Sequence, residues 1–128
     1  MHPPFPQAVP EVPVVDLSAA LEYYENRLGF SVDWGDSDGG ISGISQGRCR
    51  LFLTDRAFRE HRRNAAPIVI WLNLNSKDEV DAQFERWRAS GATVLSPPES
   101  KPWRLHEFTV ADIDGNQFRV FYDFSRDA

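Results

Sequence analysis

The chain has 128 residues, of which 41% are hydrophobic and 26% charged. This is the composition of one ordinary globular domain, which buries roughly two-thirds of its unfolded surface. The net charge of −5 argues against nucleic-acid binding, because a nucleic-acid binder needs a basic face. No apolar run approaches the length of about 18 residues that indicates a membrane span. The N-terminus also lacks the basic and apolar regions of an export signal, so we expect neither membrane binding nor export.

A strand, a helix and three strands are predicted in the first half of the chain. The alternating valines of "PEVPVV" predict the first strand, and its prolines, Pro10 and Pro13, indicate a sheet edge or a hinge. Asp16 or Ser18 is expected to cap the helix, which Gly29 ends. The helix has an apolar face made by Leu21, Tyr24 and Leu28. The stretches "FSVDW", "GISGIS" and "CRLFLTD" predict the three strands that follow.

One cysteine, Cys49, lies in the last of these strands. A single cysteine excludes an internal disulfide and is consistent with a reducing cytoplasm, where we expect the protein. Because the stretch "GRCRLFL" is apolar and strand-like, we interpret Cys49 as an inert packed thiol rather than a nucleophile.

A charged segment at residues 56–65 is predicted to join two modules, residues 8–55 and 66–124. Its basic part, "RAFREHRRN", is interpreted as a solvated helical turn. The second module repeats the order of the first, with a strand "PIVIWLNLN", a helix after Ser76 and three further strands. The apolar face of the second helix consists of Val80, Phe84 and Trp87.

The second module has two distinctive loops. The dipeptide Asp-Gly in "DIDGN" is a strong hairpin signal between the last two strands. The stretch "SPPESKPW" contains three prolines and is expected to be a rigid loop, because proline cannot donate a hydrogen bond to a neighbouring strand.

Alternation along the strands predicts which side chains share a face. The helix-covered face is expected to carry Leu51, Leu53, Phe108, Val110, Phe118 and Val120. The opposite face is expected to carry Glu11, Arg50, Phe52, Val69, Trp71, Asn73, Glu107, Thr109, Gln117, Arg119 and Phe121. A face that combines aromatic residues with a few charges is typical of a small-molecule pocket.

Three stretches of the chain carry a resemblance to a known family. They are "VVDLSAALEYYENRLGF", "VDAQFERWRASGA" and "PWRLHEFTVADIDGN". In their order and spacing, they resemble the vicinal oxygen chelate superfamily. This superfamily includes glyoxalases, extradiol dioxygenases and bleomycin-resistance proteins, and the last stretch is most similar to the bleomycin-resistance branch. The resemblance covers roughly residues 9–124. It implies an α+β fold with paired βαβββ modules, in which helices lie outside a cupped mixed sheet. It also implies a homodimer with clefts between chains or modules, whose first strand is a candidate for exchange between chains.

Metal-dependent members of that superfamily bind a divalent ion through four inward histidines and glutamates. Carried over by motif, the four positions fall near Val9, at Phe52, on "PIVIWLNL", which has no His, Asp or Glu, and at Arg119. A guanidinium would repel a dication, so we expect no metal at this site. The three histidines of the chain, His2, His61 and His106, are not placed to replace the missing ligands.

Glu107 and Arg119 are expected on adjacent strands with the same facing. One interpretation is a buried ion pair, which Glu11 could join. A second is that the charged group of a ligand joins or displaces the pair. A third is that Glu107 acts as a general acid or base, if burial raises its pKa.

The tryptophans divide similarly. Trp87 is expected in the core, whereas Trp71, with Phe52 and Phe121, either lines a cleft or fills it. Trp34 and Trp103 lie near turns, where an exposed indole indicates contact with a ligand or a partner chain. For the acidic stretch "DWGDSD" around Trp34, a solvated hairpin loop is the alternative.

The sequence thus predicts non-catalytic binding of a small aromatic or cationic compound, in the manner of bleomycin-resistance proteins and without a cofactor. The alternative is a metal-independent enzyme of lyase or isomerase type that uses Glu107. The predicted ligand-binding residues are Trp34, Arg50, Phe52, Trp71, Trp103, Glu107, Arg119 and Phe121.

Overall fold

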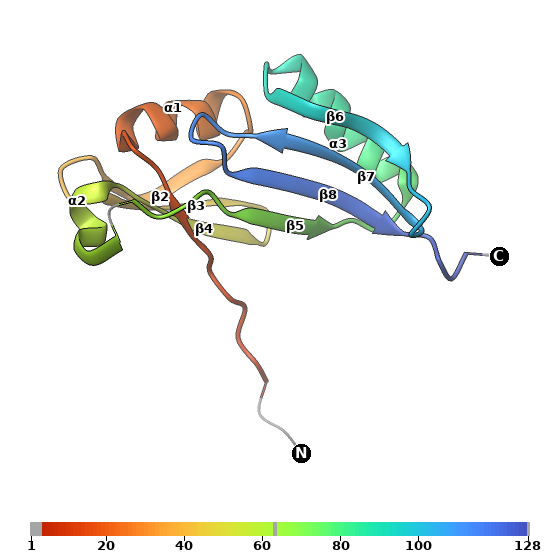
Figure 1. Ribbon diagram of the computed structural model, residues 1–128, viewed down its shortest axis with the longest axis horizontal. Helices are drawn as coiled ribbons and strands as arrows, with labels where there is room; N and C mark the ends of the chain where they lie inside the picture. The colour runs from red at the N-terminus through yellow and green to blue at the C-terminus, as the bar shows by residue number, and fades with distance from the viewer. Residues whose placement is uncertain (1–3, 63, 128) are drawn as a thin grey trace.

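Two four-stranded sheets with the same topology make up the molecule (Figure 1). The computed structural model describes residues 4–62 and 64–127. Sheet A has the strand order β1-β4-β3-β2 and sheet B the order β5-β8-β7-β6, each with one parallel and two antiparallel pairs. The elements are β1 (Glu11–Pro13), α1 (Leu17–Asn26), β2 (Ser31–Asp36), β3 (Ile41–Gln46), β4 (Cys49–Thr54), α2 (Arg56–Arg59), η1 (Glu60–Arg62), β5 (Val69–Asn73), α3 (Lys77–Ala89), β6 (Thr93–Ser100), β7 (Leu105–Ala111) and β8 (Gln117–Asp123). The α+β fold with two βαβββ units is confirmed, although one chain forms two separate sheets rather than one cupped sheet.

Both long helices begin and end at the residues that their chemistry favours. The Asp16 carboxylate accepts a hydrogen bond from the backbone N–H of Ala19 at 3.1 Å, so of the two predicted caps Asp16 is the one used. Ser76 caps α3 in the same way. After each helix the chain turns at a glycine with positive φ, Gly29 at 75° and Gly91 at 90°, a conformation that side chains disfavour.

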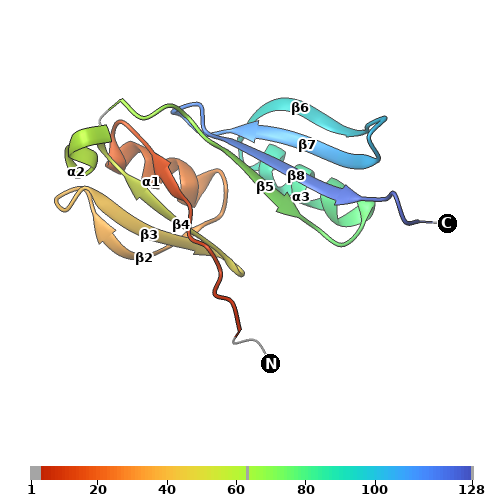
Figure 2. The ribbon, with the colours of Figure 1, turned by 60° about the horizontal axis from the view of Figure 1, so that its bottom comes forward.

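The helices lie on one side of the sheets, and both sheets contribute to one core. Figure 2 shows the sheets next to one another with α1 and α3 behind the strands. The Tyr24 ring on α1 packs edge-on against Phe118 of sheet B, with ring centroids 6.0 Å apart. In return, the Trp87 indole on α3 donates a 2.8 Å hydrogen bond to the carbonyl of Leu28. Trp87 is therefore a core residue, as predicted, and the two modules share their interior.

The predicted hairpin turn "DIDGN" also forms hydrogen bonds with residues of the first module. The buried Asp112 carboxylate accepts hydrogen bonds from the Tyr24 hydroxyl at 2.7 Å and from the Asn116 amide at 2.9 Å. The same amide donates to the carbonyl of Pro13 at the end of β1. Burial and the neighbouring Asp112 carboxylate raise the pKa of Tyr24 well above 10. A turn predicted only as a β7–β8 connection is thus also a contact between modules.

The prediction of a loop over "SPPESKPW" is wrong for its first half, because β6 continues to Ser100. This strand is at the edge of sheet B and pairs only with β7, so one side of its backbone needs no partner. The pairing register shifts between Ser96 and Glu99, where Pro97 and Pro98 lie. The prolines are accommodated by the edge position and this irregularity, and the loop is confined to residues 101–104.

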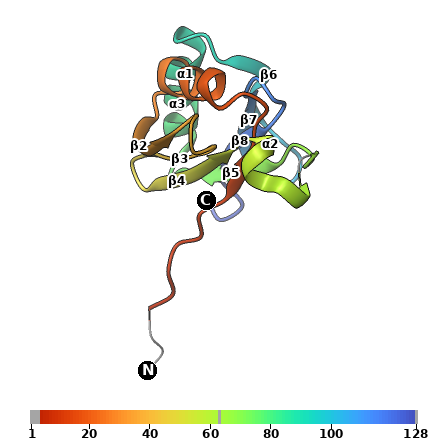
Figure 3. The ribbon, with the colours of Figure 1, turned by 90° about the vertical axis from the view of Figure 1, so that its left-hand side faces the viewer.

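The first strand, β1, is an edge strand, as its prolines predicted, and it runs parallel to β4. Residues 4–8 extend away from the folded body on the side opposite the helices (Figures 1 and 3), whereas the Pro10 carbonyl accepts from the Phe52 N–H at 3.0 Å. No helix in the described part of the chain is long and apolar enough to cross a membrane.

The basic segment after β4 forms α2 and η1. It was predicted to be solvated, but one of its arginines is buried. Arg59 is only 8% exposed, and its guanidinium donates to the backbone carbonyls of Val14 and Thr54. Buried carbonyls at the end of β4 and after β1 need donors, and Arg59 supplies them. This residue therefore holds the connecting segment against the first module.

Candidate ligand-binding site

Alternation in sheet B places a charged and aromatic face opposite the helices. Phe108 and Val110 of β7 and Phe118 and Val120 of β8 are fully buried against the helices, as predicted. The residues between them therefore point to the other side of the sheet. Register pairs Glu107 with Phe121, and Thr109 with Arg119, on this open face.

An ion pair lies at the centre of the open face. The guanidinium of Arg119 donates to the carboxylate of Glu107, which is only 1% exposed although it lies on the side of the sheet away from the helices. The first of the three interpretations, an ion pair, is thus present. Arg119 also stacks on Trp71, with its guanidinium carbon 4.3 Å from the ring centroid. The pairing and the stacking together hold one positive charge in a fixed position.

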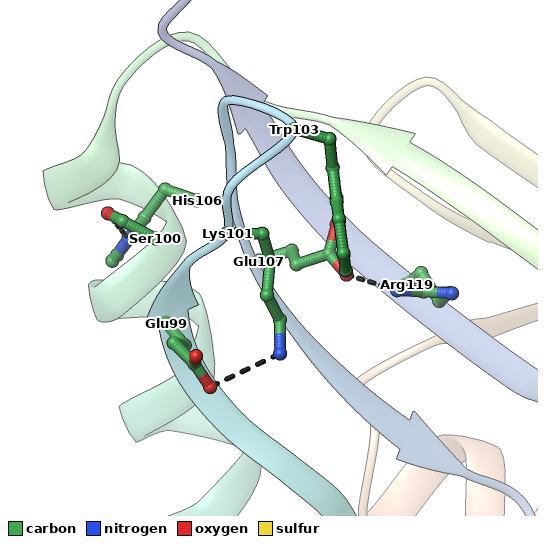
Figure 4. A network of polar contacts seen from close by, with 7 residues as sticks. All are labelled: Glu99, Ser100, Lys101, Trp103, His106, Glu107 and Arg119. Atoms are coloured by element: carbon green, nitrogen blue, oxygen red, sulfur yellow. Dashed lines mark hydrogen bonds and ion pairs between the residues drawn. The ribbon is translucent and has the colours of Figure 1, made fainter.

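Trp103 covers the carboxylate from above. It is 57% exposed, and its indole N–H lies 3.4 Å from Glu107 Oε2 (Figure 4). The loop that carries it is closed by a hydrogen bond from the Arg104 N–H to the Lys101 carbonyl, and Arg104 adopts a φ of 72°. Lys101 lies beside the indole and pairs with Glu99 at 3.2 Å. We call Trp71, Trp103, Glu107, Arg119 and Phe121 the sheet B platform.

Sheet A presents a smaller aromatic surface on the corresponding face. Trp34 and Phe52 meet edge to face, with ring centroids 5.1 Å apart. Trp34 lies directly over Gly43, because a Cβ built on that glycine would be 2.3 Å from the indole nitrogen. Arg50, on the same strand as Phe52, is exposed. We call Trp34, Phe52 and Arg50 the sheet A platform.

Gly43 was not among the predicted site residues. The sequence signal for it was the "GISGIS" stretch, in which a glycine interrupts an alternating strand. A glycine inside a strand often marks a close approach of another group. Here that group is the Trp34 indole.

The eight predicted site residues thus fall into two groups. The platform of sheet B is connected internally, by the Glu107–Arg119 pair and by the Trp71–Phe121 contact at 5.6 Å. No hydrogen bond, ion pair or ring contact joins the two platforms within residues 4–62 and 64–127. Glu11, which the sequence placed near this pair, lies on sheet A and accepts a hydrogen bond from Thr54.

The residues at the family's metal positions do not fit a metal ion. Phe52 has no donor atom, β5 offers no carboxylate or imidazole, and Arg119 carries a positive charge. The described residues contain no group of three or more His, Cys, Asp or Glu side chains that could hold a metal. We therefore derive no chemistry from a metal at this face.

The histidines lie elsewhere. His106 lies on the helix side of β7, where its ring contacts Asp81 of α3 at 2.8 Å. It also contacts Ser100 at 2.9 Å (Figure 4). His61 is exposed in η1, and His2 lies outside the described residues.

Two mixed sheets of βαβββ order, with helices on one side and aromatic open faces on the other, define the class of protein. The chain belongs to the glyoxalase/bleomycin resistance protein/dioxygenase superfamily, whose sequence model matches residues 7–120. No curated protein matches the chain significantly.

Solved structures with the same fold carry different descriptions. A glyoxalase/bleomycin resistance protein/dioxygenase from Nocardioides has a TM-score of 0.77 and 21% identity over 98% of this chain and 88% of its own. A lactoylglutathione lyase from Agrobacterium tumefaciens has a TM-score of 0.73 and 21% identity, covering 93% of this chain and 95% of its own. A bleomycin-binding protein complexed with bleomycin has a TM-score of 0.70 and 21% identity, covering 92% and 98%. Identities this low establish the fold, so function has to be inferred from the site.

Proposed function

We propose that this protein binds and sequesters a small aromatic or cationic compound in the cytoplasm without transforming it. The observation that carries the proposal is the sheet B platform, in which exposed indoles border a neutralised ion pair. Trp71 and Trp103, 46% and 57% exposed, offer flat surfaces for stacking. Because Arg119 already neutralises Glu107, the platform can bind an aromatic compound without leaving a buried charge unpaired.

We further propose that the complete cleft forms in a homodimer, with the sheet A platform of one copy facing the sheet B platform of the other. Within one chain both platforms are open, and each exposes large apolar side chains, among them Trp34 at 42% and Trp71 at 46%. Exposed apolar surface of this kind favours an interface or a ligand. A cation would then lie near the acidic turn beside Trp34, which carries Asp36 and Asp38.

Mixing two variants tests this shared cleft. Phe52→Asp should abolish binding through sheet A, and Trp71→Asp through sheet B. If each cleft combines sheets of different chains, a refolded equimolar mixture contains heterodimers with one intact cleft, and part of the binding returns. If each chain carries its own cleft, the mixture binds no better than the two variants apart.

The bleomycin-binding neighbour suggests one candidate ligand, metal-free bleomycin, whose aromatic rings and basic tail match the two properties above. Isothermal titration calorimetry with bleomycin and with smaller aromatic cations should give a one-site isotherm with a micromolar or lower Kd. An affinity of 1 μM corresponds to about −8 kcal/mol, which an aromatic-lined cleft can supply. Heat changes no larger than those of dilution across the whole set of compounds would contradict the proposal.

A metal-independent enzyme is the second candidate, and the burial of Glu107 favours it. A carboxylate 1% exposed on an otherwise open face resembles a positioned acid or base. Glu107→Gln separates the two candidates. A binder keeps its ligand with a modest change in affinity, whereas an enzyme loses turnover by about 100-fold or more. Metal analysis of the purified protein should find well under one ion per chain, and stoichiometric zinc, nickel or iron would contradict the metal-independent assignment.

A further inference from the structure

A cavity lies between the two modules, beside the parallel edge strand β5 of sheet B. It has a volume of about 350 Å³ and lies between the β3–β4 turn, the end of β5 and α3. Small-molecule sites have volumes of about 300–1,000 Å³, so this cavity has room for one or two aromatic rings. It is too small for a glycopeptide.

The cavity walls are mainly aromatic and aliphatic. Phe30, which directly precedes β2, and Trp87 from α3 line the cavity together with Leu72 and Val120 from sheet B, and Trp71 also lines it. Trp87 already satisfies its indole N–H with the Leu28 carbonyl, so it presents its ring without needing a new acceptor. A flat apolar molecule would therefore meet ring surfaces contributed by both modules.

Two polar groups in the lining indicate what else the ligand carries. The Gln83 side chain has its oxygen occupied by Arg86, at 2.7 Å, while its Nε2 is buried and lacks a partner among the described residues. A buried donor without an acceptor costs about 1–3 kcal/mol. A small rotation of this terminal amide, whose last torsion is soft, would let a ligand oxygen accept from it. Arg48, which is exposed and also lines the cavity, supplies a positive charge.

This cavity is distinct from the centre of the sheet B platform, although the open-face residues Trp71 and Asn73 line it. Glu107, Arg119 and Trp103 do not line it, and Leu72 and Val120 belong to the helix-covered face of sheet B. Only Trp71 of the sheet B platform lines it. The inference below therefore does not rest on the function proposed above.

We propose that this intermodule cavity binds an aromatic carboxylate of one or two fused rings. The rings lie against Phe30 and Trp87, and the carboxylate accepts from Gln83 and pairs with Arg48. Because both modules contribute to the site, bound ligand stabilises their association and raises the Tm.

The single cysteine reports occupancy in the unsubstituted protein. Cys49 lines the cavity and is the only thiol in the chain. We would measure its rate of modification by 5,5′-dithiobis(2-nitrobenzoate) with and without 1-naphthoate. When the 1-naphthoate concentration is ten times its Kd, about one cavity in eleven is free, so the rate of Cys49 modification should fall about tenfold. A rate that 1-naphthoate leaves unchanged would overturn the proposal, and this arm needs no variant that has to fold.

Matched variants and a matched ligand locate the carboxylate. Gln83→Met keeps the side-chain length and should weaken 1-naphthoate about tenfold, since a hydrogen bond to a charged group is lost. Arg48→Met should weaken 1-naphthoate about fivefold but leave the neutral 1-naphthamide unchanged. Equal effects of Arg48→Met on the two ligands would contradict the carboxylate assignment.

Trp103→Ala distinguishes this site from the open face. It removes part of the sheet B platform but no part of the cavity, so Cys49 protection by 1-naphthoate should match the unsubstituted protein. Protection lost in Trp103→Ala and retained in Gln83→Met would place 1-naphthoate on the open face and overturn the proposal. If the function proposed above fails instead, bleomycin and the aromatic cations do not bind, while Cys49 protection persists.

Discussion

The open faces of sheets A and B have the same topology but place aromatic and charged residues at opposite positions. In each sheet a row of paired residues crosses the middle from the parallel edge strand outward. In sheet A this row is Glu11, Phe52, Gly43 and Trp34. In sheet B it is Trp71, Arg119, Thr109 and Ser96. Sheet A therefore has a charge at the edge and an aromatic on the inner strand, and sheet B has the reverse.

This difference is consistent with the composite site proposed above. Backbone pairing determines which residues face outward, whereas the single residue at each position determines what the face binds. Phe52 with Trp34 gives sheet A a stacking surface, and Arg119 with Glu107 gives sheet B a fixed, neutralised charge pair. Two faces that differ in this way can recognise opposite sides of one ligand, whereas two identical faces cannot.

The largest expected effect comes from breaking the charge pair on sheet B. Arg119→Met leaves the buried Glu107 carboxylate without its ion-pair partner and with only the long Trp103 hydrogen bond. It should lower the free energy of unfolding by about 2–4 kcal/mol, slightly below the full cost for a buried pair because Arg119 is 32% exposed. The matched substitution on sheet A, Phe52→Met, should cost about 1 kcal/mol. Urea denaturation measures both, and equal costs would remove the distinction between the faces. Arg119→Met combined with Glu107→Gln should recover part of the loss.

The relative position of the two sheets depends on the Tyr24–Asp112 contact, which Tyr24→Phe would break. The loss should be about 1–3 kcal/mol, because the buried Asp112 carboxylate loses one donor. The raised pKa of Tyr24 adds a pH dependence. Its stabilising contribution is fully present below pH 10, the ordinary tyrosine pKa, and is lost as the pH rises toward the folded value.

Denaturation at pH 8 and at pH 10.5 checks the direction of this pH dependence. The unsubstituted protein should lose more stability between these values than Tyr24→Phe does. An equal loss would show that the Tyr24 phenol does not titrate differently in the folded and unfolded states.

A smaller effect on stability, but a specific one on sheet A, is expected from Gly43→Ala. The new methyl group would overlap the Trp34 indole, whose nitrogen lies 2.3 Å from the built Cβ position. Overpacking of this kind costs about 1–3 kcal/mol, and the value should be near the lower end because Trp34 is 42% exposed and can move. Gly39→Ala, where the nearest heavy atom is 4.0 Å away, is the matched control. A tryptophan emission maximum that is unchanged in Gly43→Ala would contradict the stacking of Trp34 described for sheet A.

The side-chain facing, the two caps and the repeat could be predicted from the sequence, because each depends on local periodicity or local chemistry. Phe108 and Glu107 were assigned to opposite faces by alternation alone. In agreement with that assignment, Phe108 is buried against the helices and Glu107 is buried beneath Trp103. The Arg119–Glu107 pair was also among the predicted alternatives, since adjacent strands bring the two residues together.

Features that depend on residues distant in sequence could not be predicted. Pro97 and Pro98 indicated a loop, but the edge position of β6 allows them in a strand. Arg59 looked solvated within its charged segment, yet carbonyls after β1 and at the end of β4 draw it into the interior. The separation of the strands into two sheets was also not predicted, because side-chain facing alone does not determine how the modules pack.

The smallest effect on stability, and the most direct test of the site, is expected from Trp103→Ala. This residue is 57% exposed, so its loss should change the free energy of unfolding by no more than about 0.5 kcal/mol. The measurement is a tryptophan-fluorescence titration of the unsubstituted protein and Trp103→Ala with metal-free bleomycin and small aromatic cations. Phe84→Leu, which changes a residue packed against the core and outside the intermodule cavity, serves as the control. We predict saturable quenching at micromolar concentrations that Trp103→Ala weakens at least about tenfold and Phe84→Leu retains. Quenching that Trp103→Ala leaves intact, or none with any compound, would contradict ligand binding at the sheet B platform.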